Sequence, residues 1–449
     1  MYFKHIKYSI TILLFALIYW IGCNTTEPSL PNNGILSISL TDVSCTEAWV
    51  NLKANGIAFP VNVNILADGS TIAQLDNLNT NDTTIYIDSL LPNRTYNIQA
   101  VIPSTNQFQA TGSNKLAVQT LDTTSSNFTW QTYTFGASNA GSSSLNDVAI
   151  INDNDIWAVG AIYMDDSTGQ PDPQPYCIAK WNGQRWLLER SLFNLYNYDC
   201  TIAGSYYGTA DAVYSFYDNT IIFTDGADFV KWDGNTYLHL PCVINLLNGS
   251  IQKIWGNSSN DFYAVGTLGT IIHFNGSTWT KIESGTNTTL NDICGYYDQA
   301  NNNQSVMAVV SNIHSLGEYR LLSISGSSAK DTLNWPYANS LAGLYFQGKY
   351  SPLYICGSGM KEYQQGEWKQ LNLPNYFTEA IRGNGENDVI AVGDYGFITH
   401  FNGVRWESEN IANNYVFYSV AIKNNTVAIA GVSTSGVVAG SAIVVIGKR

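Results

Sequence analysis

A repeated segment constrains the fold more than any other feature of this chain. Ile251–Ile282 contains the pattern N-D-x-x-A-V-G, then a short turn, an alternating run and H-F-N-G-x-x-W, and Ala380–Glu407 contains the same pattern again. Each copy divides into four short strand-like runs, with Asn-Gly, a favoured hairpin turn, between the third and the fourth. Four antiparallel strands with a Gly and aromatic signature make one blade of a β-propeller. The sequence therefore predicts an all-β fold with a propeller.

Weaker copies of the repeat occupy most of the remaining chain. They are Asn146–Trp186, Thr201–Tyr237, Asn291–Gly326, Ala342–Trp368 and Tyr418–Ile446. The last copy has no fourth strand, but Phe128–Phe135 resembles one and precedes the first copy. Pairing this strand with the last three would close the ring and remove exposed strand edges. We therefore predict a seven-bladed propeller over residues 128–449. Six or eight blades stay open as alternatives because the second and fourth copies are eroded.

The first 22 residues read as an export leader. Lys4 and Lys7 precede an apolar run of about 14 residues, which is short for a membrane span. The run ends in Trp-Ile-Gly-Cys, which resembles the bacterial lipoprotein signal, in which the Cys, here Cys23, receives lipid and becomes the mature N-terminus. An ordinary secretory signal is the alternative. Residues 23–33 form a polar, Pro-containing tether, in which no acidic residue directly follows the Cys. By resemblance to lipoprotein sorting, we expect an outer-membrane or cell-surface address.

A separate module of strand-like runs occupies residues 34–122. The stretch I-D-S-L-L-P-N-R-T-Y-N-I-Q-A-V at Ile87–Val101 resembles a fibronectin type III domain, in which a Tyr near the start of the sixth strand forms a tyrosine corner. Tyr96 is that Tyr by resemblance, and Ala117–Asp122 resembles the last strand of the family. The expected fold is a fibronectin type III-like β-sandwich that precedes the propeller. Sandwiches of other families are the alternative.

Charge and cysteine content limit the possible partners. The formal net charge is −14 at pH 7 and only 12% of residues are charged, which argues against nucleic acid and against anionic lipid as partners of the domain surface. Contact with a membrane is therefore expected only through the lipid. Among the Cys residues, Cys177 and Cys200 flank the first blade boundary and are the expected pair if a disulfide forms. We expect Cys294 and Cys356 to be small core residues.

No catalytic or metal-binding motif stands out, so we expect no cofactor, no metal and no catalytic residue. His273 and His400 occupy the same repeat position, which indicates a structural role. The repeat elements W-G, D-x-[WY]-A-V-G and F-N-G-x-x-W are similar to those of bacterial secreted propellers, including the family of the photosystem II stability and assembly factor. The resemblance implies the scaffold and does not imply a ligand. The Arg-rich patch of that family has no counterpart in this acidic chain.

Two classes of function remain. The first is a surface lipoprotein whose propeller binds a glycan, a peptide or a protein. The alternative is a glycan-active hydrolase or lyase, for which two carboxylates at a defined separation are needed. Glu379, near the start of a channel-lining strand, is the one carboxylate that the sequence places suitably.

The predicted ligand site is on the face where each outer strand leads to the next inner strand, and the insertion Tyr163–Tyr176 belongs to the same face. Loops there are rich in aromatic residues, which suit sugars and peptides. Packing of these aromatic residues between neighbouring blades is the alternative. The predicted residues are Phe193, Tyr196, Tyr198, Trp335, Tyr337, Tyr376, Phe377 and Tyr415, with a polar rim of Asn146, Gln252, Asn291 and Glu379. The repeat residues Trp186, Trp279, Trp368 and Trp406 are expected to pack between blades, and Trp279→Ala to cost roughly 3–5 kcal/mol.

Overall fold

The computed structural model describes residues 34–104, 110–137, 140–298, 303–313, 317–434 and 440–449. The expected leader, Cys23 and the tether lie outside the described residues. Among the residues that the structure describes, the regular secondary structure consists of β-strands and one 3-10 turn, η1 (Thr267–Gly269). No helix in the described ranges is long and apolar enough to span a membrane. The chain divides into two compact units, one ending at Leu121 and the other running from Asp122 to Arg449.

The first unit has two antiparallel sheets that share one apolar core. One sheet has the order β1 (Ile35–Val43), β2 (Ala48–Asn55) and β5 (Asp82–Ile87). The other has the order β4 (Ser70–Leu78), β3 (Val61–Ala67), β6 (Thr95–Ile102) and β7 (Thr111–Gly112), and β8 (Leu116–Gln119) also pairs with β6. Buried residues alternate along β3 and β6, as expected where one face of a strand covers a core. The Tyr96 hydroxyl accepts a hydrogen bond from the Leu91 amide at 2.9 Å, which is the contact of a tyrosine corner.

The second unit contains seven four-stranded antiparallel sheets in its described part. The first three are β10 (Ser144–Asn152), β11 (Asp155–Ile162), β12 (Tyr176–Trp181), β13 (Trp186–Glu189); β16 (Ala212–Ser215), β17 (Ile221–Asp225), β18 (Asp228–Trp232), β19 (Tyr237–His239); and β20 (Ile251–Ser258), β21 (Asp261–Gly266), β22 (Ile271–Phe274), β23 (Trp279–Lys281). The next three are β24 (Leu290–Asp298), β25 (Asn303–Ser311), β26 (Tyr319–Ser325), β27 (Ser328–Asp331); β28 (Leu341–Tyr345), β29 (Leu353–Gly357), β30 (Lys361–Gln364), β31 (Glu367–Gln370); and β32 (Thr378–Gly385), β33 (Asp388–Gly393), β34 (Phe397–Phe401), β35 (Trp406–Asn410). The seventh is β36 (Tyr415–Lys423), β37 (Thr426–Ser433), β38 (Ser441–Lys448) and β9 (Thr129–Phe135).

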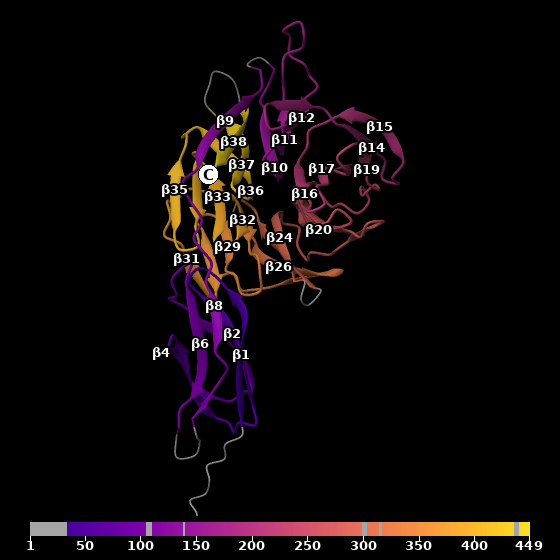
Figure 1. Ribbon diagram of the computed structural model, residues 1–449. Coiled ribbons are helices and arrows are strands. Elements are labelled where there is room, and N and C mark those ends of the chain that lie inside the picture. Colours follow the sequence, from indigo (N-terminus) through magenta and orange to yellow (C-terminus); the bar gives the residue numbers. More distant parts are fainter. Residues whose placement is uncertain (1–33, 105–109, 138–139, 299–302, 314–316, 435–439) are drawn as a thin grey trace, which may run out of the picture. The chain divides into compact units, whose positions relative to one another are not determined.

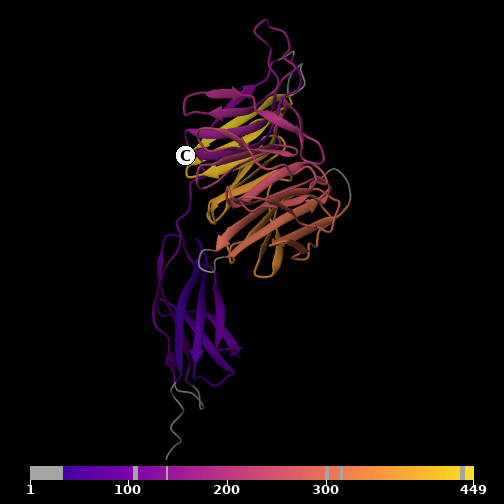
Figure 2. The ribbon, with the colours of Figure 1, turned by 90° about the vertical axis from the view of Figure 1, so that its right-hand side faces the viewer.

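The first strands of these sheets form a closed ring. Each of β10, β16, β20, β24, β28 and β32 contacts the first strand of the next sheet, and β36 contacts β10. Figure 1 shows β10, β16, β20, β24, β32 and β36 around a common centre, and Figure 2 shows the same sheets from the side. We call these seven the inner strands. The strand before the first repeat closes the ring as predicted, because β9 pairs with β38 from Phe135 opposite Ala442 to Thr129 opposite Lys448.

An inserted hairpin of β14 (Leu192–Tyr196) and β15 (Ile202–Tyr207) separates the first two sheets of the ring. The predicted second copy, Thr201–Tyr237, is therefore wrong in its first part, because the second sheet begins only at Ala212. The predicted disulfide is also wrong, since Cys200 at the hairpin turn bonds to Cys242. Cys177, the second residue of β12, is a completely buried free thiol. Cys294 and Cys356 are buried thiols, as predicted.

The repeat tryptophans pack against the preceding sheet of the ring, as predicted. The Trp279 ring lies 4.7 Å from Phe229 of β18, and its indole N–H donates to the Pro241 carbonyl at 2.9 Å. Trp406 lies 5.4 Å from Tyr354 of β29 in the same way. Trp186 contacts β9, the last strand of the seventh sheet, and Trp368 contacts Trp335 in the loop after the fourth.

We expect Trp279→Ala to lower the free energy of unfolding by roughly 2–3 kcal/mol, less than for a fully buried tryptophan, because Trp279 is only half-buried. Denaturant unfolding measures this change. Thr280→Ala, at the exposed neighbouring position, is the control and should stay within about 0.5 kcal/mol of the wild type. A Trp279→Ala protein as stable as the control would contradict the packing role.

Candidate ligand-binding face

The polar residues predicted for the rim occupy one repeat position, at a β-bulge near the start of an inner strand. They are Asn146 in β10, Gln252 in β20, Asn291 in β24 and Glu379 in β32. Ala342 in β28 and Tyr418 in β36 hold the same position. Bulges bend a strand and re-aim side chains, and they are common next to functional sites. The structure therefore brings these residues to the same end of the ring, which we call the mouth.

The bulges explain the glycine of the repeated A-V-G. In the two strong copies that glycine ends the second strand of a sheet and faces the bulge of the inner strand. A Cβ on Gly266 would lie 1.9 Å from the Ser250 carbonyl oxygen, and one on Gly393 would lie 2.0 Å from that of Phe377. No other residue fits so close to a neighbouring backbone.

Two of the predicted rim residues hold the ring together. The Asn146 side-chain amide donates to the Ala210 carbonyl at 3.2 Å, just before β16. The Asn291 amide donates at 2.8 Å to the carbonyls of Ser311 and of Leu341, which begins β28. Each amide thus joins its sheet to the next one, so these two side chains have a structural role at the mouth.

A buried aspartate follows each of these asparagines and links several sheets. Asp147 accepts hydrogen bonds from the Val213 amide of β16 at 3.0 Å and from the Ser419 hydroxyl of β36 at 2.5 Å. It also pairs with the Lys253 ammonium of β20 at 2.7 Å. A single carboxylate therefore links four inner strands.

Asp292 repeats this arrangement on the other half of the ring. It accepts the Leu344 amide of β28 at 3.1 Å and pairs with the Arg382 guanidinium of β32 through two contacts of 2.7 Å. In both cases the carboxylate binds a backbone N–H one sheet further on and a cation two sheets further on. The repeated Asn-Asp dipeptide was the available sequence signal, although nothing in it identified the cations.

Glu379 lies beside a second acidic side chain that the sequence analysis missed. Burial, together with the nearby charge of Asp394, raises the pKa of Glu379 to about 7, although Lys253 opposes the rise. Burial also raises the pKa of Asp394, and it raises that of Tyr418 with help from both carboxylates. Asp394 directly follows the repeat glycine Gly393, where the corresponding residue of the other strong copy is Thr267. That difference between copies was the only signal for it.

This environment predicts a pH-dependent stability. Because the folded pKa of Glu379 exceeds its unfolded value, its contribution makes the free energy of unfolding decrease as pH rises from about 4.5 through 7. We expect Glu379→Gln to be more stable than the wild type by about 1–2 kcal/mol at pH 8.5 and equally stable at pH 4.5. The difference at pH 8.5 is smaller than the full pKa shift implies, because Glu379 is partly exposed and solvent screens its charge. Urea unfolding at both pH values tests this. Glu367→Gln, at an exposed position of β31, should show no such difference.

The predicted aromatic residues have mixed environments. Phe193 is completely buried in the core between the first two sheets, so its assignment to the ligand face is wrong. Tyr198, at the tip of the inserted hairpin, is 74% exposed. The other predicted aromatic residues are half-buried: Tyr196, Trp335, Tyr337, Tyr376, Phe377 and Tyr415.

Several of the half-buried rings lean on the sheets. Trp335 stands edge-on to Trp368 at 4.9 Å. Tyr376 lies 5.3 Å from Phe397, which is on the third strand of the sixth sheet. Such rings pack against the sheets and also contribute exposed surface, whereas the Tyr198 side chain is mostly exposed.

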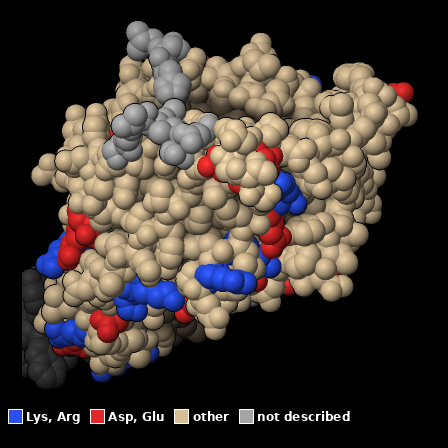
Figure 3. All heavy atoms as spheres, turned by 90° about the horizontal axis from the view of Figure 1, so that it is seen from above, with Lys and Arg blue, Asp and Glu red and all other residues tan. Residues whose placement is uncertain are grey.

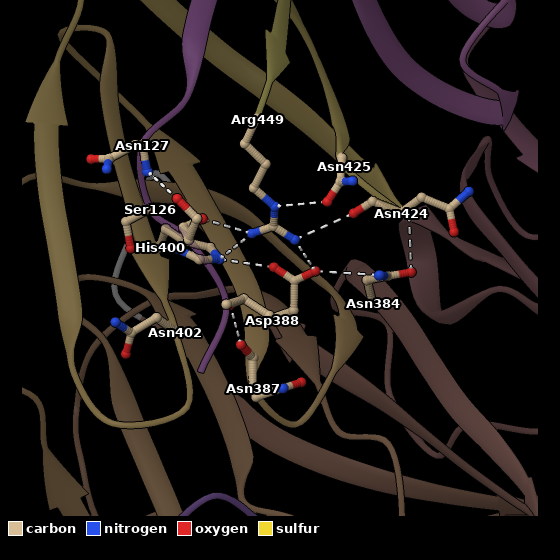
Figure 4. A network of polar contacts seen from close by, with 12 residues as sticks. Ser126, Asn127, Asn384, Asn387, Asp388, His400, Asn402, Asn424, Asn425 and Arg449 are labelled. Atoms are coloured by element: carbon tan, nitrogen blue, oxygen red, sulfur yellow. Dashed lines mark hydrogen bonds and ion pairs between the residues drawn. The ribbon is translucent and has the colours of Figure 1, made fainter. Parts of the chain in front are cut away.

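The histidines of the two strong copies are tied to aspartates. His273 Nε2 lies 2.7 Å from Asp261 Oδ1, and His400 Nε2 lies 2.8 Å from Asp388 Oδ1. Recurrence of the pair agrees with the structural role predicted from the repeat. At His400 the pair extends further, because His400 Nδ1 contacts the Ser126 hydroxyl at 2.8 Å (Figure 4).

Arg449 completes this network. Its guanidinium lies 2.6 Å from Asp388 Oδ2 (Figure 4). It also donates to the Ser125 carbonyl at 2.9 Å. Strand β38, the sixth sheet and the segment that leads into β9 therefore meet at one group of polar contacts. A pocket of about 240 Å³ lies beside it, lined in part by Phe128 and Trp130.

No family model and no curated protein matches this sequence. Solved structures do resemble it. YCF48, in a structure with a bound D1 peptide, is 13% identical with a TM-score of 0.50, covering 71% of this chain and 97% of its own. The WD40 β-propeller domain of Doa1 is 12% identical with a TM-score of 0.50, covering 72% of this chain and 98% of its own. The second unit is a β-propeller. At these identities the likeness shows the fold alone, so the resemblance to the photosystem II assembly factor family is supported only at the level of the propeller.

Proposed function

We propose that this chain is a cell-surface lipoprotein whose propeller acts as a binding module, with a glycan, a peptide or a protein held on the face at the mouth of the ring. The observation that carries the proposal is the exposed Tyr198 hairpin, inserted where an outer strand leads to the next inner strand. YCF48, a propeller that has been solved with a bound peptide, supports a binding role for this kind of scaffold.

The finer architecture belongs to the same proposal. The seven four-stranded sheets are seven blades of one propeller, over residues 128–449. The first unit, residues 34–122, is a fibronectin type III-like sandwich, for which its strand order and the Tyr96 contact are the support.

The proposed address is extracytoplasmic, with lipid on Cys23 as the only membrane contact. Mass spectrometry of the mature N-terminus tests this proposal. A mature chain that begins at an unmodified Cys23, or elsewhere, would contradict it. The proposed partners do not include nucleic acid, because the net charge of −14 argues against phosphate binding. Figure 3 shows one side of the molecule, where Lys and Arg side chains lie among Asp and Glu and form no basic patch.

Glycan and peptide arrays probed with the purified chain test the binding role. We expect at least one class of hit, weakened by Tyr198→Ala with an unchanged melting temperature. Tyr217, which is 89% exposed in the turn after β16, provides the matched control, and Tyr217→Ala should keep the hit. Arrays without any hit, or a hit that is insensitive to Tyr198→Ala, would contradict the proposed site.

A glycan-active enzyme is the second candidate because Glu379 and Asp394 supply two neighbouring carboxylates at the mouth. Glycoside hydrolysis uses such a pair, with one member protonated. A hydrolysis screen on glycans decides whether this candidate holds. Turnover that disappears in Glu379→Gln would favour the enzyme over the binding module. If no glycan is turned over, the enzyme candidate is refuted and the binding module remains as the proposed function.

A further inference from the structure

The inserted hairpin has one edge that no other strand covers. In the part of the chain that the structure describes, β14 and β15 pair only with each other. The outer edge of β14 faces the second sheet, since the Asn194 amide donates to the Asp228 carboxylate at 2.6 Å. The opposite edge belongs to β15, and Figure 1 shows both strands at the rim of the second unit.

The register identifies the backbone groups on this open edge. Asn194 is opposite Ser205, and its N–H points to Asp228, away from β15. The two residues therefore form a non-hydrogen-bonded pair, whose N–H and C=O groups face outward on both strands. Two residues further on, Tyr207 faces outward in the same way. The edge thus presents the peptide groups of Ser205 and Tyr207 to a further strand.

The hairpin surface is apolar as well as exposed. All residues of β15 except Gly204 are exposed, on both faces of the strand. Ile202 is 63% exposed, and Leu195 across the hairpin is 53% exposed. The exposed large apolar or aromatic residues of the hairpin are Leu192, Leu195, Tyr198, Ile202, Tyr206 and Tyr207. An exposed apolar edge strand is a liability for a soluble protein unless a partner uses it.

The hairpin is also held firmly in place. Phe193 is buried in the core at the base of β14, and Cys200 at the tip is bonded to Cys242 in the segment after β19. A segment fixed at both ends loses little freedom when a partner docks, which favours binding.

Charge indicates the chemistry of the partner. From Ser191 to Val230 the chain has five Asp and no Lys or Arg. Asp199 lies at the tip, and Asp225 lies at the base, beside the Tyr206 hydroxyl. Two copies of this chain paired edge to edge in antiparallel fashion would place the acidic tip of one against the acidic base of the other. A strand with a cation at each end avoids this repulsion and gains attraction instead.

We propose that the open edge of β15 docks an extended segment of a partner protein, with alternating apolar side chains and a Lys or Arg at each end. The segment adds a third strand to the hairpin, so its backbone bonds to Ser205 and Tyr207 and its apolar side chains cover Ile202 and Tyr206. This inference rests on the proposed function in treating the chain as a binding module, and it specifies the partner class and the docking strand.

A defined peptide tests the docking strand. The probe is a fluorophore-labelled Lys-Thr-Val-Thr-Val-Thr-Val-Thr-Lys, titrated with the full chain and followed by anisotropy. We expect Ser205→Pro to weaken binding about tenfold or more, because proline removes the outward N–H while edge positions tolerate it. Ser205→Ala keeps the N–H and should bind as the wild type does. Matching melting curves for the two variants show that the fold is intact.

The charges are tested separately. Asp199→Asn keeps the oxygen that accepts from the Thr201 amide but removes the charge. It should weaken binding roughly threefold at low salt and less at high salt. A probe with Glu in place of both Lys should not bind. Equal binding of the Glu and Lys probes, or unchanged binding to Ser205→Pro, would overturn the inference.

Array results separate this inference from the proposed function. Array hits that persist in Ser205→Pro, with no binding of the defined probe, would refute the edge site and leave the binding module standing. No hit from any glycan or peptide would refute both. Self-association of the wild type that disappears in Ser205→Pro would show that a second copy occupies the edge, which also overturns the proposed partner class.

Discussion

Replacing Arg449 with Ala should lower the free energy of unfolding by about 3–5 kcal/mol, because it leaves the buried Asp388 carboxylate without its guanidinium partner. The side chains of Arg449 and Asp388 are only 6% and 3% exposed, and they lie 2.6 Å apart. The change also removes the bond to the Ser125 carbonyl, which fixes the segment before β9. Lys448→Ala, at the exposed preceding residue, is the control and should change stability little.

The pH dependence provides a second measurement on the Arg449 variant. Burial alone would raise the pKa of Asp388, but hydrogen bonds from His400 and Arg449 outweigh burial and lower it. The stability that this lowering contributes is present above the unfolded pKa and is lost as pH falls through the folded one. Unfolding curves should therefore show a weaker acid dependence in Arg449→Ala. An acid dependence identical to that of the wild type would contradict the assigned role.

Replacing Arg382 with Ala should lower the free energy of unfolding by about 2–4 kcal/mol. This loss is smaller than that expected for Arg449→Ala, because the Arg382 guanidinium keeps partial contact with solvent. Asp292 would keep its bond from the Leu344 amide but would lose both contacts with the cation, while it remains buried. Chemical denaturation gives the loss. In the double variant Asp292→Asn with Arg382→Met, no buried charge is left unpaired, so we expect recovery of a part of the stability. Equal losses in the single and double variants would show that the pair does not act as a unit.

The ring was predictable because its information is local and repeated. The Asn-Gly turn, the A-V-G and the following W recur within about 30 residues, so a single copy identifies a sheet and the set identifies a propeller. The closing strand β9 was predictable for the same reason, since it resembles the strand missing from the last copy.

Features that depend on contacts between distant copies were not predictable. Cys200 pairs with Cys242 because an insertion folds back over the second sheet, and no periodicity reports that. Asp147 and Asp292 stand next to recurring asparagines, yet their cations are on sheets two positions away. Likewise, nothing in the sequence separates Phe193, which is buried, from Tyr198, which is exposed on the same hairpin.

The closing pair of β9 and β38 has a consequence for biosynthesis. Strand β9 leaves the ribosome roughly 300 residues before its partner, so it lacks its partner strand while the intervening sheets are made. Bringing ends so far apart together costs about 5 kcal/mol in chain entropy, which the completed ring must offset all at once. A chain that stops anywhere before β38 therefore carries an open ring, in which β9 and the last strand made each have an edge without a partner strand.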